Sequence, residues 1–171
     1  MREDTKITKV YRFEELSEKA RQKVMEKLAD INVDYEWWDC TYDDAKTIGV
    51  EIREFDIGRG AYCKGKFTQD ELDVAENILK EHGKDCETYK DAYDFVWTIA
   101  RMENEFHDKR SLDDFDIDYE CFDLLVDFRL MIFEDYRLLL QEEYDYLTSE
   151  EAIRETVDAN EYEFTEDGEI Y

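Results

Sequence analysis

The chain has 171 residues and a mass of 20.7 kDa, and its 48 acidic residues against 22 Lys and Arg give a formal net charge of −26 at pH 7. Hydrophobic residues make up 43 % and aromatic residues 15 %, so the chain can build a core and is not a disordered acidic tail. The charge argues against direct binding to nucleic acids or anionic membranes, which carry the same sign.

The first third of the chain predicts a strand over residues 6–13, two helices and a hairpin. Ser17 is suited to cap the first helix. Its apolar residues recur at three- and four-residue spacing: Leu16, Ala20, Val24, Leu28 and Ile31. The second helix carries Trp37 and Trp38, and Gly49 fits the position just after its end. Residues 50–57 and 61–67 predict paired strands, with a change of phase in the first that indicates a bulge.

The remaining chain is predicted to be mainly helical. Three helices are expected to open with the capping boxes Thr68-x-x-Glu71, Thr88-x-x-Asp91 and Thr148-x-x-Glu151. A longer helix is expected over residues 119–146, and a small hairpin turns at Gly168. The element order predicts one α+β domain over residues 1–171: a strand-helix-helix-hairpin part, a mainly helical acidic part and a short C-terminal hairpin.

The N-terminal residues, the short apolar runs and the cysteine pattern predict a cytoplasmic protein. The first residues, MREDTKITK, contain no apolar stretch, so we expect no secretory signal. The longest uninterrupted apolar run is four residues, Leu130–Phe133, whereas a membrane helix needs about 20. The cysteines, at positions 40, 63, 86 and 121, form no CxxC pair, and reduced thiols are expected.

The charge is distributed unevenly along the chain. Residues 1–67 hold 15 acidic and 13 basic residues, a net charge of −2, whereas residues 68–171 hold 33 and 9, a net charge of −24. We therefore treat 1–67 as a near-neutral α+β part and 68–171 as an acidic part. A concentrated negative field is suited to steering a cationic partner.

The longest predicted helix carries an acidic stripe. At 100° per residue its acids project within about 60° of one another, provided that the helix extends back to residue 116. These acids are Asp116, Glu120, Asp123, Asp127, Glu134 and Asp145. The opposite side is expected to carry Phe122, Leu125, Ile132, Phe133, Tyr136, Leu139 and Leu140. Acids four residues apart lie about 6 Å apart along the axis, a scale similar to that of nucleic-acid phosphates. The alternative is an ordinary solvated helix face.

Patterns for catalysis or metal binding are weak. The run DFDID at 114–118 resembles the start of an EF-hand loop, but Tyr119 and Leu125 replace its required Gly and Glu. Weak divalent binding to Asp113, Asp114, Asp116 and Asp118 stays open beside a solvated helix start. His82 and Cys86 have no second ligand pair nearby and are read as a helix-end residue and an apolar filler. We predict no catalytic residue, no metal and no cofactor.

Trp37 and Trp38 are the candidate aromatic anchors. Neighbours on a helix lie 100° apart, so one ring is expected in the core and the other partly exposed, where it can contact a partner. Packing of both rings in or beside the core is the alternative interpretation.

Four segments resemble small acidic proteins encoded by bacteriophages and prophages: YRFEELSEKARQKV (11–24), DYEWWDCTYDDAKTIGVEI (34–52), FDIGRGAYCKGKF (55–67) and ANEYEFTEDG (159–168). The resemblance implies a protein that works in an infected bacterial cell, and its charge invites analogy with DNA-mimic antirestriction and anti-CRISPR inhibitors. It brings no catalytic residues.

Three functions follow as hypotheses. In the first, Asp116, Glu120, Asp123, Asp127 and Glu134 mimic nucleic acid and occupy the basic groove of a host restriction or CRISPR nuclease. In the second, the chain is a non-catalytic adaptor that binds a partner protein through Trp37 or Trp38. In the third, it is a small metal-dependent enzyme.

Overall fold

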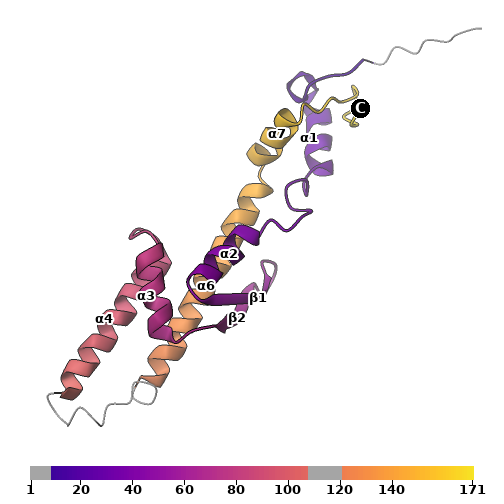
Figure 1. Cartoon of the computed structure of the whole chain (residues 1–171). Helices are drawn as coiled ribbons and strands as arrows, with labels where there is room; N and C mark the ends of the chain where they lie inside the picture. The colour runs from indigo at the N-terminus through magenta and orange to yellow at the C-terminus, as the bar shows by residue number, and fades with distance from the viewer. Residues whose placement is uncertain (1–8, 108–120) are drawn as a thin grey trace, which may run out of the picture. The chain divides into compact units, whose positions relative to one another are not determined.

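The computed structural model describes residues 9–107 and 121–171, and shows an α+β fold (Figure 1). The chain divides into two compact units. We call the first, from Met1–Trp37 and Glu142–Tyr171, the terminal unit, and the second, Trp38–Gln141, the central unit. This division does not coincide with the change of charge at residue 67, and the prediction of a single domain stays a prediction.

The terminal unit is built around two short helices, α1 (Glu18–Lys27) and α7 (Glu150–Ala159), with a 3-10 turn η1 (Phe13–Glu15) before the first. The prediction that Ser17 caps α1 is confirmed, because its side chain accepts a hydrogen bond from the Ala20 amide. The buried residues of these elements and of the C-terminal segment form one cluster: Phe13, Leu16, Ala20, Val24, Ile153, Val157 and Phe164.

Both ends of the described chain meet in the terminal unit. Phe164 forms isolated antiparallel bridges with Tyr11 and with Ile170, and Gly168 has a φ of 80° in the turn between. The C-terminal turn is therefore confirmed. The strand predicted over 6–13 is wrong in its described part, which forms a single bridge and then turns into η1, since Phe13 enters the core from a 3-10 turn.

The central unit begins with α2 (Asp39–Thr47), which packs against the hairpin of β1 (Val50–Asp56) and β2 (Tyr62–Phe67). The strands are antiparallel, and their register shifts between Ile52 and Glu54, which confirms the bulge. Gly49 has a φ of 90°, as its place after the helix predicted. Helix α2 is shorter than expected, because Trp38 is its N-cap and Trp37 precedes it.

Three helices complete the central unit: α3 (Glu71–Glu81), α4 (Glu87–His107) and the first part of α6 (Phe122–Leu147). The rings of Phe95 on α4 and Phe128 on α6 are stacked, with centroids 4.2 Å apart. The sulfur of Cys121, just before α6, lies 3.9 Å from that of Met102 on α4. Because the later residue of α4 meets the earlier residue near α6, the two helices run antiparallel.

The predicted threonine caps are wrong in detail. Asp70 and Ser149 occupy the N-cap positions of α3 and α7. Thr68 and Thr148 instead donate their hydroxyls to backbone carbonyls, those of Gly49 and Tyr144. Thr88 lies inside α4. Within the described residues, the helices do not combine the length and the apolar character needed to cross a membrane, and all four cysteines are free thiols.

Candidate functional site

The predicted acidic stripe is present on α6 in its described part. Asp123, Asp127 and Glu134 are exposed on this helix. Asp116 and Glu120 lie outside the described residues, and α6 begins at Phe122.

The opposite, apolar side of α6 is narrower than expected. Four of the predicted residues are buried: Leu125, Ile132, Tyr136 and Leu140. Two are not, because Phe122 is 63 % exposed and Leu139 is 44 % exposed. Phe133 is half-buried, and its ring contacts Phe67 of β2 at a centroid distance of 5.9 Å. The elements packed on α6 thus cover a smaller arc of the helix than its apolar pattern suggested.

One member of the stripe is already neutralised. Glu134 accepts two hydrogen bonds from the Arg137 guanidinium, at 2.8 Å from Nε and 2.7 Å from Nη2. These bonds lower the pKa of Glu134 below its usual value. By contrast, Asp123 and Asp127 form no ion pair with a described residue. They are the stripe residues whose charge is open to a partner.

A second group of carboxylates lies where α4 faces α6. We call Glu87 and Asp91 of α4, with Glu134 and Asp135 of α6, the α4–α6 carboxylate cluster. Burial, which is the largest cause, and the negative charges of Asp91, Glu87 and Glu134 together raise the pKa of Asp135 from 3.8 to about 7. Its Oδ2 atom is buried without a hydrogen-bond partner among the described residues.

Asp91 shows the same crowding from the other helix. Burial raises its pKa, the charges of Glu87 and Asp94 add to the effect, and Lys90 opposes it. Lys90 is itself bonded to Glu87 at 2.6 Å. The cluster thus holds two acids paired with cations, Glu87 and Glu134, and two without an ion pair to a described residue, Asp91 and Asp135. The sequence pattern did not point to it, because it depends on the register between two helices.

A polar network ties four helices of the central unit together. The Tyr136 hydroxyl donates to Asp44 Oδ2 at 2.8 Å, and Asp44 Oδ1 lies 3.5 Å from His82 Nε2. His82 Nδ1 lies 2.7 Å from the hydroxyl of Thr88. The His82 bond first, and then the Tyr136 bond, lower the pKa of Asp44.

This carboxylate–imidazole–hydroxyl order has the chemistry of a hydrolytic relay, but Thr88 is only 4 % exposed. A buried hydroxyl cannot attack a substrate, so we read the network as a structural tie. His82 is the C-cap of α3, as its predicted place at a helix end implied. Among the described residues, no three His, Cys, Asp or Glu side chains are arranged to hold a metal ion.

The two neighbouring tryptophans differ in burial. Trp37, in the terminal unit, is 9 % exposed and packs on Tyr144 at 5.7 Å between ring centroids. Trp38, in the central unit, is half-buried and packs edge-on against Phe55 at 5.6 Å. One core ring beside a partly exposed ring is the expected arrangement. Partner binding by these residues stays a prediction, and Trp38 is the one with accessible surface.

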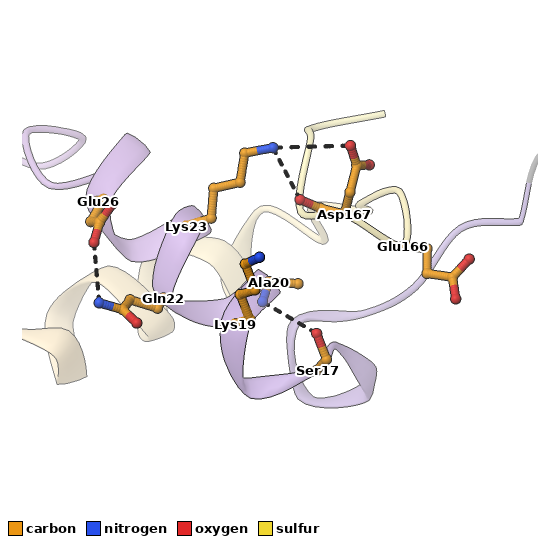
Figure 2. Close-up of a pocket in the computed structure, with 8 residues that line it drawn as sticks. All are labelled: Ser17, Lys19, Ala20, Gln22, Lys23, Glu26, Glu166 and Asp167. Carbon is orange, nitrogen blue, oxygen red and sulfur yellow. Dashed lines mark hydrogen bonds and ion pairs between the residues drawn. The ribbon is translucent and has the colours of Figure 1, made fainter.

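The terminal unit carries an open pocket of about 650 Å³ between α1 and the C-terminal turn (Figure 2). Its lining mixes charges of both signs: Ser17, Lys19, Ala20, Gln22, Lys23, Glu26, Glu166 and Asp167. The Lys23 ammonium donates to the Asp167 carbonyl at 3.2 Å and lies 2.8 Å from the Glu169 carboxylate. Because Lys23 is held by these acids, the pocket presents no strong preference for an anion or a cation.

The chain matches no protein-family model, and no curated protein or solved structure is significantly similar to it.

Proposed function

We propose that this protein is an acidic inhibitor of the bacteriophage type, which binds a host nucleic-acid-binding protein of the restriction or CRISPR nuclease class. Carboxylates on α4 and α6 of the central unit would take the place of phosphates in the partner's basic groove. The residues proposed to make the contacts are Asp123 and Asp127, with the α4–α6 carboxylate cluster behind them.

The observation that carries this proposal is the pair Asp123 and Asp127, both exposed on one face of α6 and without an ion pair to a described residue. The folded chain keeps these carboxylates together although their charges repel one another, and a cationic partner surface would relieve that repulsion. A solubilising surface needs no such crowding, because spread charges serve that purpose equally well.

The exposed acids have a suitable spacing. Asp123 and Asp127 are four residues apart on one helix, about 6 Å along its axis. Phosphates along one DNA strand repeat every 3.4 Å of axial rise with additional sideways displacement, so the two spacings are of similar scale.

The test is capture from bacterial lysate with the tagged full chain, with washes at low and high salt and a challenge with duplex DNA. The expected partner binds nucleic acid, is released by salt and is displaced by the duplex, because screening acts on exposed charges within about 8 Å at physiological ionic strength. The double charge reversal Asp123→Lys/Asp127→Lys should abolish capture.

A matched control is available on α7, where Glu151 and Glu155 are also exposed and four residues apart. Glu151→Lys/Glu155→Lys changes the net charge equally and should leave capture intact. Capture that survives reversal of the α6 pair, with helix content unchanged by circular dichroism, contradicts the proposal. Partners that resist salt and ignore DNA would instead favour an adaptor that binds through an aromatic surface including Trp38.

A further inference from the structure

Helix α6 exposes a second, apolar series that its packing leaves open. Leu124, Met131 and Leu138 follow one another at seven-residue spacing, which returns to nearly the same helix face. Met131 is 38 % exposed and Leu138 is 42 % exposed, while Leu124 is half-buried. The three residues span 14 positions, about 21 Å of helix.

The orientation of this series follows from Phe128, whose ring stacks on Phe95 of α4. In helical projection, Leu124, Met131 and Leu138 lie within about 80° of Phe128. They lie on the side away from Ile132, which is fully buried in the core. The series therefore borders the outward side of the junction between α6 and α4.

Helix α4 contributes acids to the same side. Glu87 and Asp94 project within about 60° of Asp91, on the side away from the buried Phe95. Since α4 and α6 run antiparallel, with Phe95 stacked on Phe128, Asp94 comes level with Arg129, within one helical turn of Met131. We call the surface formed by this apolar series and by Glu87 and Asp94 the α4–α6 face; one side of it is apolar and the other is acidic, with Arg101 one heptad beyond Asp94.

We propose that this α4–α6 face binds an amphipathic helix of the partner protein, with aliphatic side chains on one side and Lys or Arg along the flank. The apolar face would cover Leu124, Met131 and Leu138, and the cations would lie against Glu87 and Asp94. The inference rests on the proposed function, since it specifies which cationic element of the partner the central unit takes.

Charge complementarity selects this occupant. A second copy of the chain, with its net charge of −26, would bring further acids against Glu87, Asp91 and Asp94. A purely polar cationic segment would leave the apolar side in water. A helix with an apolar face and a cationic flank can contact both the apolar residues of α6 and the acids of α4, as in known helix-in-groove recognition.

The test uses a fluorescein-labelled peptide of roughly 18 residues, about 27 Å as a helix, with Leu at two positions of each heptad and Lys elsewhere. A peptide of the same composition but scrambled order lacks the apolar face. Fluorescence anisotropy with the full chain at about 0.15 M salt should show at least tenfold tighter binding of the ordered peptide. Equal affinities would overturn the inference.

Substitutions locate the site. Met131→Ala/Leu138→Ala should weaken peptide binding about tenfold, as expected for central apolar anchors. Leu130→Ala is the matched control, because Leu130 is 63 % exposed on the same helix but projects 100° away from Met131. It should bind as the wild type does. Unchanged binding by the double variant overturns the inference.

Hydrogen exchange can be measured on the wild-type chain, so its result does not depend on whether a variant folds. Protection on peptide addition should rise over residues 87–94 and 124–138, and protection confined to the terminal unit would refute the site. Failure of the proposed function and failure of this inference give different results. Loss of partner capture in Asp123→Lys/Asp127→Lys with full capture by Met131→Ala/Leu138→Ala supports the proposed function and refutes helix binding at the α4–α6 face.

Discussion

Replacing Asp135 by Asn is expected to stabilise the central unit at neutral and alkaline pH. The folded-state pKa of Asp135, about 7, lies above the ordinary value of 3.8. Between those two pH values the folded chain holds a proton that the unfolded chain has lost. The stability of the wild type therefore falls as pH rises from about 4 to about 7, and the full penalty persists above that range.

The size of the effect follows from the same values. A change from 3.8 to about 7 corresponds to about 4 kcal/mol, at about 1.4 kcal/mol for each pH unit. Asp135 is only half-buried, and solvent screening reduces that figure. We expect Asp135→Asn to gain about 1–2 kcal/mol at pH 8, and close to nothing at pH 4.

The assay is urea unfolding followed by circular dichroism at both pH values, with Glu134→Gln as the matched control. Glu134 is the neighbouring acid on α6, but Arg137 holds its pKa below the usual value, so removing its charge should be slightly unfavourable. A gain for Asp135→Asn that is equal at pH 4 and pH 8, or absent at pH 8, would refute the reasoning. So would a carboxyl resonance of Asp135 that titrates near pH 4.

Three further outcomes are expected. Gly65→Ala should destabilise the central unit by about 2 kcal/mol or more in urea titrations, because a Cβ there would overlap the Glu51 carbonyl oxygen; a loss below about 0.5 kcal/mol would contradict this. Tyr136→Phe should cost about 1–2 kcal/mol by removing the hydroxyl that donates to Asp44, and an unchanged urea midpoint would show that water replaces it. The bonds from Lys23 and Lys27 lower the pKa of Glu169 from 4.5 to about 2, so its contribution is present above pH 4.5 and lost as pH falls to about 2. Melting of Glu169→Gln should therefore match the wild type at about pH 2 and occur at lower temperature at pH 7; a constant difference would exclude the ion pair as the cause.

Features that depend on a few neighbouring residues could be predicted. Ser17 caps α1, Gly49 takes a positive φ after α2, and the register shifts between Ile52 and Glu54. Each is decided by the local backbone and by the side chain at that position.

Where two residues compete for one local role, tertiary hydrogen bonds decide. Thr68 and Thr88 stand in plausible capping boxes, yet their hydroxyls bond Gly49 and His82 from other elements. Asp70 then takes the N-cap of α3. No pattern along the chain contains those distant partners, so the predicted start of α3 lies two residues before its N-cap, and the predicted start of α4 lies inside the helix.

The same limit applies to the candidate site. The sequence indicates that the second part of the chain is acidic and that Asp123 and Asp127 share a helix face. It does not indicate that Asp91 and Asp135 crowd each other, because that depends on α4 lying antiparallel against α6. Net charge predicts the sign of the field, whereas the register of the helix pair determines which carboxylates carry unrelieved repulsion.

The make-up of the terminal unit has a consequence for the order of assembly. Its two segments come before and after the central unit in the sequence. The 104 residues of the central unit must therefore be synthesised before Val24 of α1 can contact Val157 and Phe164. On a ribosome, α1 is synthesised roughly 7–28 s before Phe164, at about 5–20 residues per second. The central unit is complete in sequence before the terminal core can close. Until then, the apolar face of α1 lacks Ile153, Val157 and Phe164, and the newly made chain depends on its own C-terminal end to complete this core.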